Sequence, residues 1–510
     1  MEQRREHMEH KRRFRNHISI ILEQTGAALA GLFILAATAV FQSLDEITSE
    51  DISALTDRSL LILLSVTALL LFSVLSQVFV WSKTYISIEE NAVVIEKGSI
   101  NKKKNTIGIR NISNINLEQN LLEMLLGTCK VKLDTNSLST ADSTDVKIVL
   151  KKADALWFQQ TVTEKLEAGR AGMDAVAVHG ENPGEGETYD VRADIGDIIS
   201  HGVFSISVVS VALFLLVIVG TVFSVKEFLD DPGVIGTIAG GTAAVVIAVL
   251  IAGSALWDTV KDFVKYYDFR AKRRDDKIYI KYGFLKKVEY TIPVDKIQAL
   301  KLRQSFVARI GGRYMAEIVN VGMGDDQEER HSFLVLYCTP EKLKERLLLL
   351  LPEYARTVDQ PVERIPYGAW AAWSLPAAVY LAVVLCCSYL CSFILDGQMS
   401  SDAYRLPVLL VTAAFILGMP VVLLLVYRTA GVGMGGHFLK ITRGYFGKEI
   451  ISVKYGKIQY VEFKQNLIAK AWGIKKGEIH LLAASDNACH SIPYFTGNKE
   501  EIIKRGMLIF

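Results

Sequence analysis

The sequence has little charge, few prolines and few cysteines for its length. Of 510 residues, 22% are charged, 11 are proline and six are cysteine. The cysteines are scattered and form no CxxC motif, which excludes a disulfide-stapled secreted domain and predicts reduced, buried thiols. The net charge of +2 argues against a nucleic-acid-binding protein that depends on a strongly basic chain. Hydrophobic residues make up 50% of the chain, which is too many for a water-facing surface unless they are concentrated in particular segments.

Six segments are long and apolar enough to cross a bilayer, which requires about 20 residues in a helix. They are Ile18–Phe41, Ser59–Trp81, Gly202–Ser224, Gly233–Trp257, Trp370–Leu395 and Leu406–Tyr427. The six segments form three pairs with short, acidic or lysine-poor links, whereas the segments that flank the pairs are long and rich in Lys and Arg. The positive-inside rule therefore predicts a multi-pass protein of the cell membrane with its N-terminus, its C-terminus and all long segments in the cytoplasm.

A short motif repeats at the same interval as the pairs. An isoleucine is followed after seven residues by glutamine, then by a small polar residue, and a glycine comes eight residues after the glutamine. The three copies contain Ile112, Gln119 and Gly127; Ile297, Gln304 and Gly312; and Ile458, Gln465 and Gly473. Because two independent signals share one period, the chain is predicted to be three copies of a hairpin followed by a soluble domain.

The soluble segments alternate apolar and polar residues with a period of two, which predicts half-buried antiparallel strands, and each ends in a helical pattern. We therefore expect an α+β membrane protein with six transmembrane helices. The predicted organisation is a basic N-terminus (1–17), hairpin 1 (18–81), domain 1 (84–168), a flexible acidic linker (169–200), hairpin 2 (201–257), domain 2 (266–351), a linker (352–369), hairpin 3 (370–427) and domain 3 (436–510).

The chain resembles bacterial membrane proteins with PH-like domains, specifically the YdbT-like members with three modules. The resemblance is carried by Lys296-Ile-Gln298 with Gln304-Ser305 and Gly312, and by Lys457-Ile-Gln459 with Gln465-Asn466 and Gly473. The first copy departs from this pattern at Asn111-Ile-Ser113. The resemblance implies a seven-stranded bent antiparallel sheet closed by a C-terminal helix, a smaller single-module homologue as partner, and no enzyme activity.

Two sets of residues are candidates for function. Basic residues near the membrane ends could contact anionic headgroups of the inner leaflet or a partner, although basic residues there also follow from membrane topology alone. They are Lys102, Lys103, Lys104, Arg270, Lys272, Arg273, Arg274, Lys286, Lys287, Lys475 and Lys476. The repeated Ile, Gln and Gly are interpreted as structural, with the glutamine satisfying backbone groups where a strand turns, or alternatively as part of a ligand or partner groove.

Motif searches predict no catalytic residue, metal or cofactor. Gly431, Gly433 and Gly436 match GxGxxG, but this segment leaves a membrane span and enters a β-rich domain, so we interpret it as a flexible connection. His480 and His490 lack metal-ligand spacing.

The leading hypothesis is a non-enzymatic membrane scaffold with cytoplasmic docking domains. The resemblance adds a role in envelope stress or in resistance to membrane-active antimicrobials. The alternatives are a transporter of lipid or amphiphilic peptide that uses the hairpin bundle, because nearly charge-free spans disfavour ion coupling but not an amphiphile, and, with less support, an enzyme acting on lipid headgroups.

Overall fold

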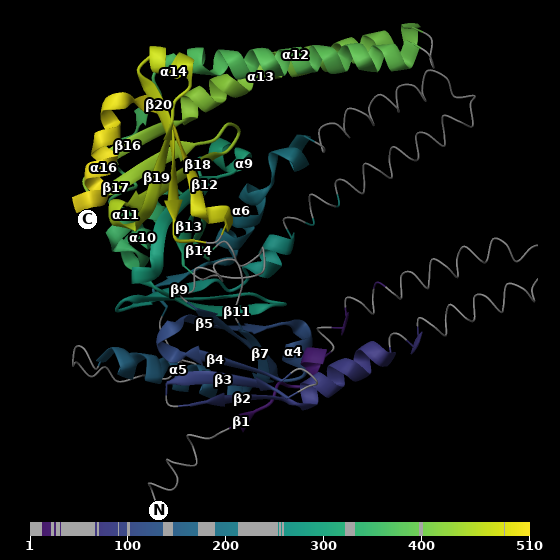
Figure 1. Cartoon of the computed structure of the whole chain (residues 1–510), viewed down its shortest axis with the longest axis vertical. Coiled ribbons are helices and arrows are strands. Elements are labelled where there is room, and N and C mark those ends of the chain that lie inside the picture. The colour runs from purple at the N-terminus through teal and green to yellow at the C-terminus, as the bar shows by residue number, and fades with distance from the viewer. Residues whose placement is uncertain are drawn as a thin grey trace, which may run out of the picture. The chain divides into compact units, whose positions relative to one another are not determined.

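The computed structural model describes residues 13–21, 71–89, 91–98, 102–135, 146–171, 189–212, 260–321, 332–396, 401–483 and 485–509, and the isolated positions 25, 26, 31, 67, 68, 253 and 257. The chain divides into two compact units. The first contains the first module together with Lys286–Tyr290, and the second contains Gly186–Leu285 and Thr291–Phe510. Figure 1 traces the chain with its elements labelled.

Each module contributes seven strands and a closing helix, with a 3-10 turn after the fourth strand. In the first module these are β1 (Arg13–Phe14), β2 (Thr84–Ile88), β3 (Ala92–Lys97), β4 (Lys103–Gly108), β5 (Ile112–Gln119), β6 (Thr128–Thr135), β7 (Val146–Lys151) and α5 (Lys152–Ala171). In the second they are β8 (Val191–Arg192), β9 (Arg270–Arg274), β10 (Lys277–Tyr282), β11 (Lys287–Pro293), β12 (Ile297–Gln304), β13 (Tyr314–Asn320), β14 (Ser332–Cys338) and α10 (Pro340–Leu350). In the third they are β15 (Glu363–Arg364), β16 (Gly431–Gly435), β17 (Phe438–Arg443), β18 (Lys448–Lys454), β19 (Ile458–Lys464), β20 (Ile474–Leu481), β21 (Cys489–Thr496) and α16 (Glu500–Ile509).

The period of two in the sequence becomes a buried face and a more exposed face in the strands. In β10, Ile278, Ile280 and Tyr282 are buried and the residues between them are partly or fully exposed. The closing helices cover such faces: Phe158 of α5 is fully buried in the core of the first module. Helix α10 begins at the N-cap Thr339, whose hydroxyl accepts a hydrogen bond from the Lys342 amide, with proline at the first helical position.

The first strand of each module precedes the membrane hairpin instead of following it. Strand β1 pairs with β2 across the predicted hairpin 1, and β15 pairs with β16 across hairpin 3. Strand β8, which pairs with β9, likewise precedes hairpin 2. Segments that the sequence predicted to be an N-terminal tail and two linkers therefore each supply a strand. In the third module, the strands on either side of α12 and α13 are neighbours in one sheet.

Helix α6 (Ile195–Ser205) overlaps the end of the predicted acidic linker and the start of predicted hairpin 2. Its side chains Ile198 and His201 are buried, and the helix stops before Ser207, whose hydroxyl accepts a hydrogen bond from the Ser210 amide. The boundary predicted at Gly202 is therefore too early, because the apolar residues of α6 pack on the soluble part of the second unit.

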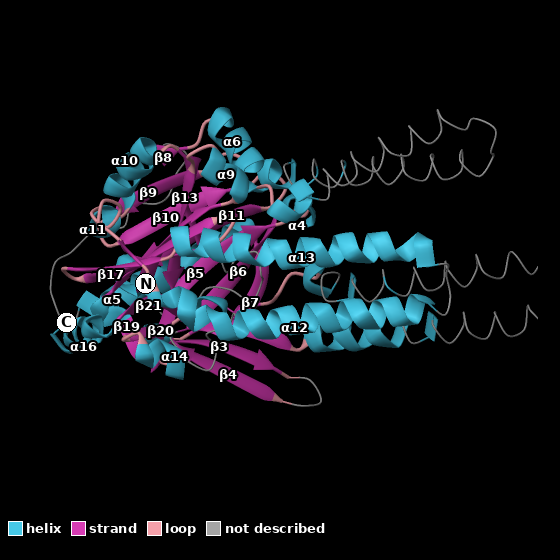
Figure 2. Cartoon of the chain, turned by 90° about the horizontal axis from the view of Figure 1, so that it is seen from above, coloured by secondary structure: helices cyan, strands magenta, loops and turns pink. Residues whose placement is uncertain are grey.

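Within the described residues, two helices are long and apolar enough to span a membrane, rather than the six that were predicted. They are α12 (Gly368–Asp396) and α13 (Ser401–Thr429), which lie side by side (Figure 2). Many of their apolar side chains are exposed. A shorter apolar helix covers Leu71–Ser82. The greater part of the other four predicted spans lies outside the described residues.

Aromatic residues cluster where α12 and α13 meet the third module. The rings of Trp370 and Tyr427 are 5.5 Å apart, and Trp373 contacts Trp370 at 5.8 Å and Tyr494 at 6.3 Å. Amphipathic rings are favoured at the level of the lipid headgroups. The cluster therefore marks the level of the headgroups at the end of the two helices that adjoins the third module, which we call their membrane end.

In the second unit, one seven-stranded sheet runs from the second module into the third, in the order β14-β13-β12-β18-β17-β16-β15. Strand β12 pairs with β18 over six residues, from Ala299↔Val453 to Gln304↔Lys448. Ala299 and Val319 of the second module also belong to the buried core of the third. We call this pairing the sheet joint; it makes the two modules one continuous structure.

The predicted flexible connection at the GxGxxG match is wrong. Gly431 and Gly433 lie in strand β16 and are buried. A Cβ atom on Gly431 would lie 2.6 Å from the Glu363 carbonyl oxygen, and one on Gly433 would lie 2.5 Å from that of Pro361. These glycines therefore permit close backbone packing of the preceding segment rather than motion.

Candidate functional site

The repeated glutamine has the same geometry in all three modules. Each side-chain amide donates to the backbone carbonyl nine residues later, with N to O distances of 2.8, 3.0 and 2.8 Å for Gln119, Gln304 and Gln465. A five-residue helix lies between: α4 (Leu121–Leu125), α9 (Phe306–Ile310) or α14 (Leu467–Ala471). The repeated glycines end this turn with φ of 63–64°, a conformation that favours glycine. The glutamine therefore holds the two ends of the turn together.

The short helices expose apolar side chains in every module. Leu125, Ile310 and Leu467 are 81%, 75% and 87% exposed. In the third module, Trp472 follows α14 directly and packs against Gly368 at the start of α12, where an added Cβ would lie 2.9 Å from that of Trp472. The turn that contains α14 thus lies at the start of α12, where exposed apolar side chains can enter the membrane–water interface.

Most of the basic residues predicted after hairpin 2 form intramolecular pairs. Arg273 makes two hydrogen bonds to Glu353, at 2.8 and 2.6 Å, and these raise the pKa of Arg273. Arg270 binds the carboxylate of Asp268. Arg274 lies 3.2 Å from Asp190.

Lys272 is buried, with its ammonium 5.3 Å from the Tyr189 ring centre and 5.2 Å from that of Tyr279. The Lys272–Tyr189 contact, like the pairs of Arg273 and Arg274, joins segments that are far apart in the sequence.

The remaining basic candidates differ in their surroundings. Lys102, Lys103 and Lys104 are exposed at the β4 edge, and Lys104 lies 3.4 Å from Glu96. Lys475 pairs with Glu500, and Lys476 is exposed. Lys286 and Lys287 belong to the first unit, where they meet strand β5.

A charge pair between the fifth and sixth strands recurs in each module, with its sign reversed in the first. Glu118 lies 2.7 Å from Lys132, Arg303 lies 3.2 Å from Glu317, and Lys464 lies 2.8 Å from Glu478. The side chains of Glu118 and Lys132 are only 3% and 1% exposed, whereas those of Lys464 and Glu478 are 41% and 30% exposed. The same pair is thus buried in the first module and open in the third.

In the first and second modules, a further strand pairs with the fifth strand: β11 with β5, and β18 with β12. A residue in or next to that strand has a charge opposite to that of the fifth-strand residue, Glu118 or Arg303. Within the first unit, Lys286 lies 3.5 Å from Glu118. At the sheet joint, Glu449 of β18 lies opposite Arg303 and 3.1 Å from Lys301. Burial acts to raise the pKa of Glu449, but the hydrogen bond from Arg443 and the charge of Lys301 outweigh it and lower the pKa to about 2. Lys286, directly before β11, and Glu449, within β18, thus bring opposite charges to the two edges, although the residue directly opposite Glu118 is Val288.

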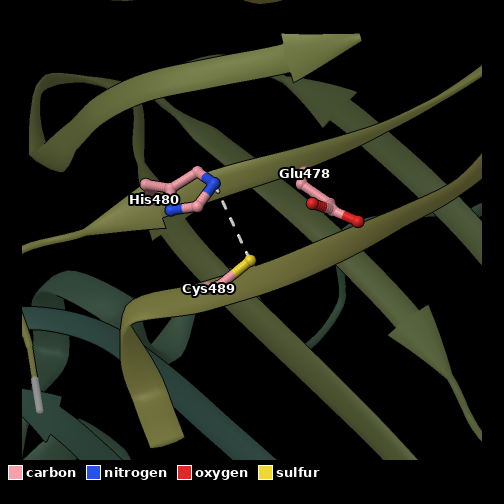
Figure 3. Close-up of side chains that lie close together, drawn as sticks. All are labelled: Glu478, His480 and Cys489. Atoms are coloured by element: carbon pink, nitrogen blue, oxygen red, sulfur yellow. Dashed lines mark hydrogen bonds between the residues drawn. The ribbon is translucent and has the colours of Figure 1, made fainter. Parts of the chain in front are cut away.

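Strands β20 and β21 bring Glu478, His480 and Cys489 together, which the sequence spacing did not predict (Figure 3). One ligand atom from each lies within 4.8 Å of the others, and the Cys489 sulfur is 3.8 Å from His480 Nε2. The sequence separation hid this group because His480 and Cys489 are cross-strand neighbours. The ammonium of Lys464 already binds Glu478, and burial raises the pKa of the Cys489 thiol. These donors are therefore better explained by the Lys464 ion pair than by a metal.

His480 also stacks on Tyr460, with ring centres 4.0 Å apart and planes 9° from parallel. Tyr460 is 55% exposed and occupies the position on β19 that Ala299 occupies on β12. Ala299 is buried in the core of the following module. At this position, therefore, the third module has an exposed aromatic pair, Tyr460 with His480, whereas the second module has Ala299, which packs into the core of the third module.

Comparison with known proteins shows the same threefold division. The family described as "Bacterial PH domain" matches residues 30–165, 202–341 and 377–501. The chain belongs to the bacterial PH domain family. This membership agrees with the three repeated sheet modules, and each match covers most of a predicted hairpin. The chain is 22% identical over 435 residues to the "UPF0699 transmembrane protein YdbT" of Bacillus subtilis (strain 168), covering 82% of each chain. No solved structure matches it.

Family membership, the transmembrane relative and the two apolar helices together make this bacterial PH domain protein a membrane protein.

Proposed function

We propose that this bacterial PH domain protein is a non-enzymatic scaffold, with six transmembrane helices in three hairpins and three modules that dock partners on the cytoplasmic face. The observation that carries the proposal is the connection of a hairpin to its module. Helix α12 leaves the sheet after β15 and α13 returns into β16, its neighbour in that sheet. A hairpin held at both ends positions a sheet close to the membrane, as a docking surface requires.

Two further features support a surface fixed near the headgroups. Trp370, Trp373 and Tyr427 form an aromatic cluster at the membrane end of the helices. Exposed Lys102 and Lys103 lie on a strand edge, and each cation near an anionic leaflet contributes about 1 kcal/mol of binding. Anionic lipid is accordingly one contact of the scaffold and a smaller single-module homologue is its protein partner. The role would be in envelope stress or in resistance to membrane-active antimicrobials.

Co-purification tests the scaffold function. The full-length chain, co-expressed with a single-module bacterial PH domain protein, is isolated in mild detergent and its mass is measured by light scattering. We expect a complex of fixed stoichiometry. Isolation of the chain alone, even after gentle crosslinking in membranes, would contradict a scaffold with this partner.

Orientation is tested separately. Single-cysteine variants in a cysteine-free background, placed at the exposed positions Tyr445 and Tyr85, are labelled with a membrane-impermeant thiol reagent in intact cells. Protection in intact cells and labelling after lysis are expected for cytoplasmic modules. Labelling from outside at either position would overturn the topology.

A second candidate, transport of a lipid or amphiphilic peptide, is favoured by an apolar groove along α13. The groove has a volume of about 610 Å³ and is lined mostly by α13, including Phe415, Gly418 and Val422, with Tyr380 of α12. An acyl chain fits an open apolar groove of this kind. Transfer of a fluorescent lipid by reconstituted vesicles, reduced by Gly418→Phe, would support transport; equal transfer by protein-free vesicles would contradict it.

A further inference from the structure

In the third module, one edge of the fifth strand, β19, has no strand paired with it among the described residues. In the other two modules the same edge of the fifth strand is paired with a strand of the following module. In the described part of the chain, β19 pairs with β20 only, and it ends the sheet β19-β20-β21. Strand β12, by contrast, pairs with β13 on one side and β18 on the other. Strand β12 is buried along nearly its whole length, whereas β19 is largely exposed. An edge strand of this kind offers unpaired backbone groups to another strand.

We propose that the β19 edge binds a β-strand of a different chain, which carries a carboxylate opposite Lys464 and a β-branched side chain opposite Tyr460. This inference rests on the proposed scaffold function and identifies the surface that it uses. The partner strand would extend the sheet by the same antiparallel pairing that joins β12 to β18.

The register of the incoming strand follows from the two filled edges. Gln119 lies opposite Lys287, and Gln304 lies opposite Lys448. Each of these lysines is seven residues before the 3-10 turn that follows its strand. The repeated glutamine thus sets the same register twice, which places the lysine-equivalent residue of a partner opposite Gln465.

The charge of the partner strand follows from the same comparison. Lys464 takes the position of Arg303, and the residue opposite Arg303 is Glu449. The Lys464–Glu478 pair is still partly exposed, as expected for a pair whose covering strand is absent. At the sheet joint, Glu449 contacts Lys301 and Arg443 and lies opposite Arg303. On β19 the Lys301 position is taken by Glu462, which lies 3.5 Å from Lys464. Lys464 is therefore the cation that a carboxylate at the Glu449 position would meet.

A second copy of this chain does not satisfy that requirement. Among the described residues, its edge strand of the corresponding type is β4, and Lys102, directly before β4, takes the position seven residues before the 3-10 turn. Lys103 would then lie opposite Lys464, and like charges directly opposite each other are destabilising. Lysines on an edge strand are a common device against edge-to-edge association. The occupant is therefore a strand from another protein.

Peptide binding to the full-length protein in detergent tests the edge. The probe is a fluorescein-labelled peptide with the sequence of residues 446–455, which contains β18, and the comparison peptides are the same sequence with Glu449→Lys and the sequence of residues 101–110, which contains β4. Fluorescence anisotropy is expected to show binding of the first peptide and weaker binding of the other two, by up to about fivefold, since a cross-strand charge pair contributes up to about 1 kcal/mol.

The decisive variant is Lys464→Glu combined with Glu478→Lys. It keeps an internal ion pair, with the signs that Glu118 and Lys132 have in the first module. We expect it to prefer the Glu449→Lys peptide. We expect Arg505→Glu, at an exposed position of α16, to keep the original preference. Circular dichroism and an unchanged melting temperature establish that both variants are folded.

Three results would overturn the proposal: no binding of the 446–455 peptide, the same peptide preference in the charge-swapped variant, or binding of the 101–110 peptide as tight as that of 446–455. The last result would indicate association between copies. If the edge fails these tests while the single-module partner still co-purifies, the scaffold function stands and another surface carries it.

Discussion

Breaking the Glu118–Lys132 pair should destabilise the protein far more than breaking the equivalent pair in the third module. Glu118→Leu leaves the Lys132 ammonium, 1% exposed, buried without this carboxylate. Loss of one partner from a buried pair costs about 3–5 kcal/mol, whereas an exposed pair is worth about 0–1 kcal/mol. Lys464→Leu, which removes a pair with 41% and 30% exposed side chains, should therefore cost under about 1 kcal/mol.

Two buried cysteines allow each unit to be followed separately. Burial is the main reason that the pKa of Cys129 is raised to about 12 and that of Cys338 to about 11, so neither thiol should react while its unit is folded. Thiol labelling during a thermal ramp, quantified by peptide mass spectrometry, should show a midpoint for Cys129 lowered by more than about 10 °C in Glu118→Leu. For Cys338 in Lys464→Leu, the shift should be under about 4 °C.

The double variant Glu118→Leu with Lys132→Met provides the control. Replacement of a buried ion pair by apolar residues of similar volume is often neutral, so most of the lost stability should return. Equal shifts in the two single variants, or no recovery in the double variant, would refute the argument that burial sets the cost of breaking this pair.

Acidification should weaken the second unit, because burial lowers the pKa of His490 to about 4 and that of His201 to about 3, while both titrate near 6.5 in the unfolded chain. The unfolded state then binds more protons below pH 6.5, and the stability contributed by His490 falls by about 2 kcal/mol at pH 5, so His490→Leu should remove that part of the pH dependence in thermal melts. Gly433→Ala should lower the same melting temperature, with a cost of about 1–3 kcal/mol, because its Cβ would lie 2.5 Å from the Pro361 carbonyl oxygen. Gln304→Leu should cost about 1–3 kcal/mol in chemical unfolding by leaving the Arg313 carbonyl without its amide donor.

The repeated strand and turn could be predicted because their determinants are local. An isoleucine at the start of the strand, a glutamine near its end and a glycine at the end of the turn lie within 16 residues, and each acts on its own backbone. The glycine at 312 has φ of 63°, and the turn before it closes through the Gln304 amide. Spacing along the chain is enough to detect such a unit.

The first strand of each module could not be predicted in the same way. Strand β15 has two residues, too few to show a period of two, and its partner β16 lies beyond two membrane helices. The GxGxxG segment was misinterpreted for the same reason, since the backbone that Gly433 packs against belongs to Pro361, more than 70 residues earlier. Flexibility and close packing leave the same glycine pattern in a sequence.

The basic cluster at Arg270–Arg274 shows a similar limit. From the sequence alone, lysines and arginines near a predicted span are interpreted as headgroup contacts or as topology signals, because their acidic partners cannot be identified. Glu353 and Asp190 lie about 80 residues away on either side, and the structure pairs them with Arg273 and Arg274. Long-range ion pairs of this kind are fixed by the sheet arrangement and have no signature in local composition.

The sign reversal of the repeated charge pair limits what repetition alone can imply. Glu118 accepts a strand that brings Lys286, whereas Arg303 accepts one that brings Glu449, so strands from different modules are not interchangeable. The lysines of β4 suit an acidic edge, and among the described residues the acidic edge at Glu118 is occupied within the first unit. A β4 strand from another copy would have to displace a segment that the chain itself holds at high effective concentration. Charge and tethering together therefore leave the β4 edge without a favourable site on another copy, while the Lys464 edge remains suited to an acidic strand.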